Sequence, residues 1–373
     1  MKILIFTAST GGGHKRAAAA MKEYFETASR DNRVMIVDGI AQTGRFYNKF
    51  ICGGYTTLAK RMPQFYGKLY RNSDKESKLN NLCEKINRFK GKYILPVIKD
   101  FDPDAIISCH AFLTLMLGDL KTKGLIKVPV VSLITDFQAH YTYIAEGIDH
   151  YIVAGKSVAD DMSERYGVEA SRIHPLGIPV FQRFMTFPDK DELKRSLGLN
   201  TDEKIILFMA GSFGVNEVLG FYKSIASETE GCRFVVITGR NQHLYSRFKD
   251  VVDPERTKLL MFVDNVEDYM HCADLIITKP GGLTVTESLQ CRLPMAIYSA
   301  YPGQEADNAA YLAKRGVSVT LDKNPGKTVS EIIGDDERLA EMSENCKKTL
   351  NVNSCKKIYE LLQEITAEKG SQN

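Results

Sequence analysis

The sequence lacks the features that mark several classes of protein. Its eight cysteines are scattered, and none stands in a CxxC or CxxH spacing. This pattern argues against a metal site or a disulfide framework and is typical of buried free thiols in a reducing compartment. No apolar run approaches the ~20 residues needed to span a bilayer. The first residues read directly into a strand, so we expect no signal peptide. Any membrane contact is therefore expected to be peripheral.

The net charge of +3 is small, but the charge is unevenly distributed. Between residues 44 and 99, thirteen Lys or Arg oppose three acidic residues, and aromatic and aliphatic residues lie among them at spacings typical of amphipathic helices. Such a surface suits an anionic membrane, to which each cation contributes about 1 kcal/mol. The membrane-binding candidates are Lys60, Arg61, Lys68 and Arg71. The alternative is a solvated helical face whose aromatics pack on the sheet. No nucleic-acid motif is present, and nucleic acid is not expected as a partner.

Predicted strands alternate with helices along the whole chain, which predicts an α/β protein with parallel sheets. In the first half the strands are expected at 3–6, 34–37, 105–108, 130–134, 151–154 and 173–176. In the second half they are expected at 205–209, 234–238, 259–263, 275–278, 295–298 and 318–320. The length fits two doubly wound, Rossmann-like domains facing across a cleft. We expect them at 1–180, with a basic helical insertion at about 44–99, and at 181–345, followed by a helical tail at 346–373.

Residues 278–308 carry the most specific signal. A strand ends in Pro-Gly-Gly, a helix begins near Thr284, a second strand follows, and another helix begins near Glu305. Gly281 and Gly282 allow a ligand to approach the backbone, and the N–H groups at the helix start favour an anion. These features predict a diphosphate site. Glu287 lies one helical turn further on, where it can face ribose hydroxyls.

The polar residues that follow supply the acceptors and donors that a sugar requires: Gln304, Glu305 and Asn308. A turn at residues 211–214 offers a further corner, where backbone N–H groups and the Ser212 hydroxyl can reach phosphates. Together the corners predict a nucleotide-sugar site.

The chain resembles the two-domain B-type (GT-B) glycosyltransferases that make glycolipids, in particular bacterial diacylglycerol glucosyltransferases and plant monogalactosyldiacylglycerol synthases. The motifs that carry the resemblance are TGGGH (10–14), TDFQAH (135–140), GIP (177–179), GSFG (211–214), TGRN (238–241), TKPGGLTVTES (278–288) and PGQEADNA (302–309). They span nearly the whole chain. The resemblance implies a UDP-sugar donor in the second domain. The implied donor residues are Ser212, Phe213, Gly214, Arg240, Val263, Gly281, Gly282, Leu283, Thr284, Glu287, Gln304, Glu305 and Asn308.

The catalytic candidates lie in the first domain. His14 follows three glycines at the start of a helix, which favours projection into the cleft, and we favour it as general base or acceptor-positioning residue. Asp136 and His140 lie past the strand at 130–134, and either one could also deprotonate a hydroxyl. No DxD carboxylate pair stands at a strand end, and helix N-termini can supply the positive field, so no metal or other cofactor is expected.

The predicted function is inverting transfer of glucose or galactose from UDP-glucose or UDP-galactose to a lipid such as diacylglycerol, giving a β-glycolipid. The inversion is implied by the resemblance. The expected location is the cytoplasm, peripherally at the inner face of a bacterial cell membrane. Alternatives are transfer to another lipid-linked acceptor, as in peptidoglycan-type N-acetylglucosaminyl transfer, and a UDP-sugar 2-epimerase. A UDP-sugar sensor is a third. A dinucleotide-dependent oxidoreductase is disfavoured because TGGGH lacks the G-x-G-x-x-G spacing.

Overall fold

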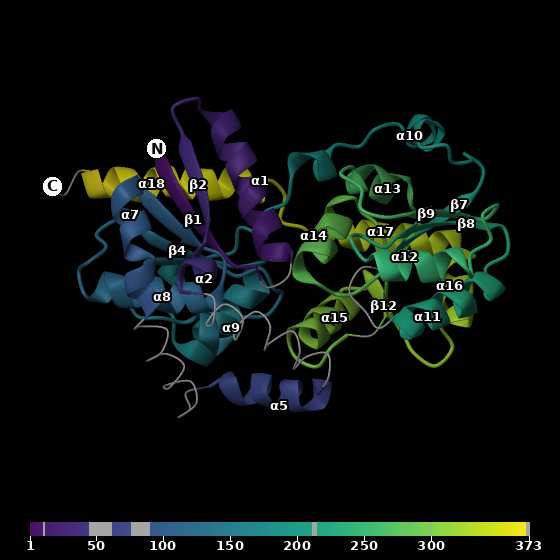
Figure 1. The fold of residues 1–373 in the computed structure, drawn as a ribbon, viewed down its shortest axis with the longest axis horizontal. Helices are drawn as coiled ribbons and strands as arrows, with labels where there is room; N and C mark the ends of the chain where they lie inside the picture. Colours follow the sequence, from purple (N-terminus) through teal and green to yellow (C-terminus); the bar gives the residue numbers. More distant parts are fainter. Residues whose placement is uncertain (10–11, 45–61, 76–89, 211–214, 299, 371–373) are drawn as a thin grey trace.

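The protein forms two lobes, each built on a parallel six-stranded sheet flanked by helices (Figure 1). The structure is a computed structural model that describes residues 1–373 except 10–11, 45–61, 76–89, 211–214, 299 and 371–373. The predicted fold class, two doubly wound α/β units of the GT-B type, is confirmed. The motif residues Ser212, Phe213 and Gly214 and the basic residues Lys60 and Arg61 lie outside the described residues.

The first sheet has the strand order β2-β1-β3-β4-β5-β6. Its strands are β1 (Lys2–Thr7), β2 (Arg33–Asp38), β3 (Ala105–Ser108), β4 (Val130–Leu133), β5 (His150–Ile152) and β6 (Ile173–His174). The chain moves to one side after β1 and then returns to place β3 on the other side. Loops diverge at such a switch point, and ligands bind outside the carboxyl ends of the strands there.

The second sheet has the order β12-β11-β10-β7-β8-β9, with its switch point between β7 and β10. The strands are β7 (Lys204–Met209), β8 (Cys232–Ile237), β9 (Thr257–Leu260), β10 (Leu275–Thr278), β11 (Met295–Tyr298) and β12 (Ser318–Leu321). Central strands such as β10, Leu-Ile-Ile-Thr, are buried at every position, as expected for strands covered on both faces. The predicted strand at 259–263 begins two residues earlier and ends at Leu260, so Val263 lies in the loop beyond it.

Helices connect the strands of each sheet. In the first lobe they are α1 (Gly13–Ala28), α2 (Gly39–Gln42), α5 (Pro63–Ser73), α7 (Leu95–Phe101), α8 (Ala111–Thr122) and α9 (Lys156–Tyr166), with short 3₁₀ turns η2 (Gly91–Tyr93), η3 (Tyr141–Tyr143) and η4 (Ala170–Arg172). The second lobe has η5 (Gln182–Met185), α10 (Lys190–Ser196), α11 (Val215–Glu228), α12 (Gln242–Lys249), α13 (Val266–Cys272), α14 (Gly282–Gln290), α15 (Gln304–Lys314), α16 (Pro325–Ile333) and α17 (Asp336–Thr349). The helix α14 begins at Gly282, two residues before the start predicted at Thr284.

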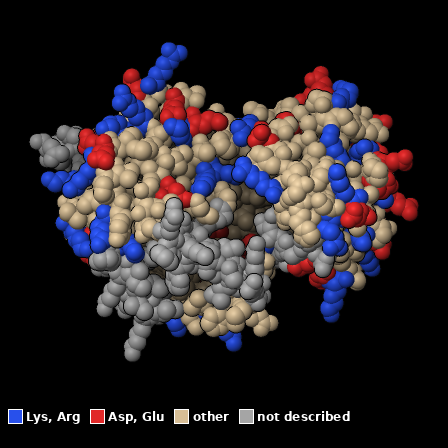
Figure 2. Space-filling view, in the orientation of Figure 1, with Lys and Arg blue, Asp and Glu red and all other residues tan. Residues whose placement is uncertain are grey.

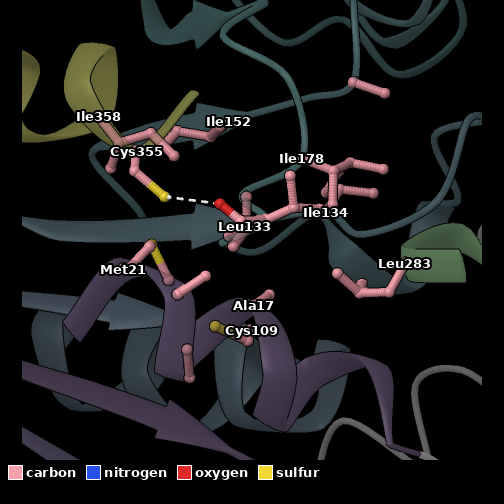
Figure 3. Close-up of a cluster of buried hydrophobic side chains, with 14 of the residues drawn as sticks. Ala17, Met21, Cys109, Leu133, Ile134, Ile152, Ile178, Leu283, Cys355 and Ile358 are labelled. Atoms are coloured by element: carbon pink, nitrogen blue, oxygen red, sulfur yellow. Dashed lines mark hydrogen bonds between the residues drawn. The ribbon is translucent and has the colours of Figure 1, made fainter. Parts of the chain in front are cut away.

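The chain returns to the first lobe after α17. The last helix, α18 (Ser354–Gly370), packs along α1, where the Tyr359 ring lies 5.5 Å from that of Phe25 and the Asn32 amide donates to the Tyr359 hydroxyl at 2.9 Å (Figure 1). Buried apolar residues extend from α1 and β4 to Leu283 of α14 and Cys355 of α18 (Figure 3). The core thus continues from one lobe into the other, which fixes the position of α14 against the first lobe.

The described cysteines are all buried and free, in agreement with the prediction for them. In the part of the chain that the structure covers, no helix is both long and apolar enough to cross a bilayer. The described part of the basic insertion includes the 11-residue helix α5, η2 and α7. Helix α5 lies apart from both sheets, on the side of the molecule where α9 and α15 meet (Figure 1).

Candidate active site

Figure 2 shows a hollow between the two lobes. The loops that follow β4 and β10 meet between the lobes, where the Thr135 carbonyl lies against Gly282. In the first lobe, helix α1 begins at Gly13, so His14 lies in its first turn, beyond the carboxyl end of β1. The His14 side chain is half-buried, with Nδ1 3.2 Å from the Thr135 hydroxyl. Burial lowers the pKa of His14 to about 4, against the effect of a hydrogen bond to the Cys109 backbone. The imidazole is therefore neutral near pH 7, the protonation state that a general base requires, while its burial in this arrangement of the lobes weakens it as a base.

A second histidine, His110, lies beside His14. It caps α8, where its Nδ1 accepts a hydrogen bond from the Phe112 N–H at 3.3 Å. The two imidazole rings meet edge to face with centroids 5.1 Å apart, and burial, followed by the neighbouring His14, holds the pKa of His110 well below its ordinary value. Sequence reasoning missed this residue. Its signal was the one used for Asp136, since His110 lies just past the buried strand β3, with Cys109 between them.

Thr135 connects the two lobes at this point. Its hydroxyl lies at His14, while its carbonyl oxygen lies against Gly282, where an added Cβ would come within 1.8 Å of that oxygen. Only glycine permits so close an approach. Gly281, the residue before α14, has open space around it, whereas the Leu283 side chain is buried and would lie 3.3 Å from a Cβ added at Gly13. Any ligand contact by residue 283 would therefore come from its backbone. Thr284 is partly buried in the first turn of α14.

Asp136 and Asn308 join the lobes. The Asn308 amide nitrogen donates to Asp136 Oδ1 at 3.1 Å and to the Pro280 carbonyl at 3.0 Å, and its oxygen accepts from the Phe137 N–H at 2.9 Å. Asn308 is 1% exposed, so in this structure its amide is engaged within the protein, and its contact with a sugar stays a prediction. Burial raises the pKa of Asp136 to about 6, against the lowering effect of Asn308.

Both ring nitrogens of His140 are engaged within the first lobe in this structure. Its Nδ1 lies 2.8 Å from the Thr142 hydroxyl, and its Nε2 lies 3.1 Å from the Tyr70 carbonyl oxygen. The residue is also buried. His140 anchors the end of α5 to the first lobe. This leaves His14 and Asp136 as the predicted catalytic residues that lie where the lobes meet.

Glu287 forms a second link between the lobes. Its carboxylate is 1% exposed and lies 2.7 Å from the guanidinium of Arg16 on α1. Neither carboxylate oxygen has a well-directed hydrogen bond to any residue that the structure describes. Burial raises the pKa of Glu287 to about 7, and Arg16 opposes this change. In this structure the carboxylate faces Arg16, and ribose hydroxyls would be suitable donors for its oxygens.

Gln304 and Glu305 begin α15 beside the loop that follows β10. Gln304 Oε1 accepts from the Tyr66 hydroxyl at 2.7 Å. Glu305 Oε2 accepts from the Tyr301 N–H at 3.0 Å and lies 3.8 Å from Lys279 Nζ. Burial raises the pKa of Glu305, with Lys279 opposing it. These side chains form a polar rim next to the Gly281 corner.

The remaining predicted residues lie further along the same sheet edge or on α5. Arg240 is exposed and stacks on the exposed Phe262 ring, 4.8 Å from its centroid, and Val263 follows in the same loop. Lys68 and Arg71 are exposed on α5. No three His, Cys, Asp or Glu side chains among the described residues come together as a possible metal site.

Comparison with known proteins agrees with this architecture. Residues 14–180 match the family of monogalactosyldiacylglycerol (MGDG) synthase, and residues 205–362 match the glycosyltransferase family 28 C-terminal domain. A processive diacylglycerol beta-glucosyltransferase of Bacillus licheniformis is 29% identical over 92% of this chain and 90% of that protein.

Among solved structures, the chain is similar in fold to MurG of Acinetobacter baumannii, with a TM-score of 0.63, 14% identity, and coverage of 97% and 99% of the two chains. The UDP-GlcNAc 2-epimerase from Neisseria meningitidis bound to UDP-GlcNAc has a TM-score of 0.62 and 13% identity, with coverage of 98% and 100%. These likenesses concern the fold alone. The two family matches cover nearly the whole chain, which is therefore a two-domain glycosyltransferase of the B type that resembles the glycolipid-forming diacylglycerol glucosyltransferases and MGDG synthases.

Proposed function

We propose that this protein transfers a hexose, glucose or galactose, from a UDP-sugar to a diacylglycerol-like lipid, giving a β-glycolipid. The observation that carries the proposal is the meeting of two corners at Thr135, with a neutral His14 on one side and the glycine-opened start of α14 on the other. The names of the curated relatives support the lipid acceptor, since they act on diacylglycerol.

In the proposed reaction, the acceptor hydroxyl oxygen attacks C1 of the hexose from the side opposite the diphosphate. The bond from C1 to the leaving oxygen breaks, UDP leaves with the bonding electrons, and the hydroxyl proton passes to His14. One displacement converts an α-linked donor into a β-glycoside. Three residues are proposed to hold the donor: Glu287 at the ribose, and Gln304 and Glu305 at the hexose.

The positive end of α14 is proposed to stabilise the charge that develops on the diphosphate. This nine-residue helix directs the free N–H groups of its first turn toward the Gly281 corner, where the surrounding space is open. The Thr135 carbonyl occupies the side next to Gly282, so the donor would enter while the lobes are further apart. We propose that this arrangement works without a metal ion.

Helix α5 is proposed to meet the membrane that holds the acceptor. Its outward side exposes Met62 and Phe65 by more than half, at 54% and 53%, next to the exposed cations Lys68 and Arg71. Apolar side chains between cations suit the interface of an anionic bilayer. The proposed location is therefore peripheral, at the cytoplasmic face of the membrane.

The test is incubation with labelled UDP-glucose or UDP-galactose, each with and without diacylglycerol in anionic liposomes. We expect a labelled glycolipid with one donor, only when lipid is present, and with full activity in EDTA. The variant His14→Ala controls for non-enzymatic breakdown of the donor. Conversion of the nucleotide sugar without lipid would instead identify an epimerase, and a strict requirement for Mg²⁺ or Mn²⁺ would contradict the metal-free mechanism.

A further inference from the structure

Helix α5 is fixed to the first lobe at its C-terminal end. Asp74, which follows the helix, accepts hydrogen bonds from the Tyr141 N–H at 3.0 Å and from the Tyr166 hydroxyl, and it pairs with Arg165. His140 binds the carbonyl of Tyr70, one turn earlier. These contacts hold the helix on the lobe that carries His14.

The same helix lies directly on the second lobe at the start of α15. A Cβ added at Gly67 would lie 2.5 Å from Pro302 Cβ, so the helix backbone rests on this loop. Gly303 has a φ of +113°, a conformation that favours glycine, and a Cβ there would lie 3.0 Å from the Tyr66 ring. Helix α5 therefore bridges the lobes and covers the residues that precede Gln304.

The contact between Tyr66 and Gln304 has a chemical consequence. Tyr66 is 5% exposed, and its hydroxyl donates to Gln304 Oε1 at 2.7 Å. An amide side chain can take two orientations that exchange its oxygen and nitrogen. In this structure the Gln304 oxygen faces α5 and accepts from the Tyr66 hydroxyl, so in this arrangement a hydrogen bond from Gln304 to a sugar hydroxyl would be donated by Nε2.

We infer that Tyr66 is a positioning residue for the donor hexose, acting through Gln304. This inference rests on the proposed role of Gln304 at the sugar. It makes the geometry of the donor site depend on a helix of the acceptor lobe. The orientation of Gln304, and with it recognition of the hexose, is then complete only when α5 is seated on α15.

The experiment is a double-mutant cycle with Tyr66→Phe and Gln304→Ala, measured with whichever of UDP-glucose and UDP-galactose the enzyme turns over faster. Loss of one neutral hydrogen bond should raise KM for the nucleotide sugar about 3- to 10-fold in Tyr66→Phe. UDP affinity, measured by calorimetry, should stay unchanged because UDP carries no hexose. In the Gln304→Ala background, Tyr66→Phe should have no further effect on KM.

Tyr70→Phe is the matched control, since Tyr70 is one turn away on α5 and bonds Asp307 of α15 instead of Gln304. Its KM for the nucleotide sugar should remain within about 2-fold of the wild-type value. Equal effects of Tyr66→Phe in both backgrounds, an unchanged KM, or a parallel loss of UDP affinity would overturn the inference. If Gln304→Ala itself leaves KM and turnover unchanged, the proposed sugar contact of Gln304 fails. If only Tyr66→Phe is silent, the positioning role alone fails.

Discussion

Replacing Glu287 by Gln tests the interface between the lobes through its pH dependence. The Glu287 carboxyl is buried, and burial raises its pKa from 4.5 to about 7. Because the folded state binds this proton more tightly than the unfolded chain does, protonation stabilises the fold. The stabilisation is fully present below pH 4.5 and is lost as the pH rises to about 7. The difference between the two pKa values corresponds to about 3 kcal/mol.

Gln is neutral at every pH, so Glu287→Gln should escape this loss. The free energy of unfolding of Glu287→Gln minus that of the wild type should therefore increase by about 2 to 3 kcal/mol between about pH 5 and pH 8. Urea denaturation followed by far-UV circular dichroism would measure this, since the chain has no tryptophan for fluorescence. The matched variant Arg16→Gln removes the cation that lowers the pKa of Glu287. In this variant the pH-dependent loss of stability should therefore continue to a higher pH than in the wild type. If the free energies of unfolding of Glu287→Gln and the wild type change equally with pH over this range, the reasoning is refuted.

The same titration should affect donor binding. Ribose hydroxyls would donate to the ionised Glu287 carboxylate, and a hydrogen bond to a charged group is worth roughly 1.5 to 3 kcal/mol. Affinity for UDP-glucose should therefore rise as the pH passes through about 7 in the wild type, and should be lower and independent of pH in Glu287→Gln. Calorimetry without lipid acceptor measures binding alone. A wild-type affinity that is flat with pH and unchanged in the variant would separate Glu287 from the ribose.

Three further predictions concern the proposed base, the membrane-binding cations and the pair formed by Asp136 and Asn308. His14→Ala should lower turnover by about 10²-fold or more while leaving UDP affinity unchanged, and near-normal turnover would point to Asp136 as base. Reversing the charges of Lys60, Arg61, Lys68 and Arg71 should abolish sedimentation with anionic vesicles but keep UDP binding; wild-type protein that ignores such vesicles at low salt would contradict the membrane role. Asn308→Asp would place a second carboxylate 3.1 Å from Asp136, so its thermal midpoint should fall at pH 8 more than at pH 5, whereas equal losses would refute this pairing.

The strands and the glycine corners could be predicted because their signals are local. The run of mainly β-branched residues in β10 indicates by itself a strand buried on both faces. The glycines at residues 281 and 282 likewise indicate that another group comes close to the backbone. His110, two residues past the end of β3, carries the signal that singled out Asp136 and could have been found in the same way. The predicted site residues that the structure describes lie at or near the facing sheet edges, with Lys68 and Arg71 on α5.

The partners of the polar side chains could not be predicted, because they come from distant parts of the chain. Asn308 was expected at a sugar, but its amide bonds Asp136, 172 residues away. His140 was expected to support catalysis, but it bonds the backbone of Tyr70 on a separate helix. Each side chain has the chemistry predicted for it, and tertiary packing decides which group receives the hydrogen bond.

The two buried acids of the interface connect closure of the lobes to proton binding. Asp136 and Glu287 belong to different lobes, and burial raises the pKa of each, to about 6 and about 7. Separating the lobes would return water to both carboxylates and lower both pKa values. Closure without ligand is then opposed by ionisation, most strongly above about pH 7. A donor whose hydroxyls bind the Glu287 carboxylate would offset that cost, so donor binding and closure of the lobes over His14 would favour each other.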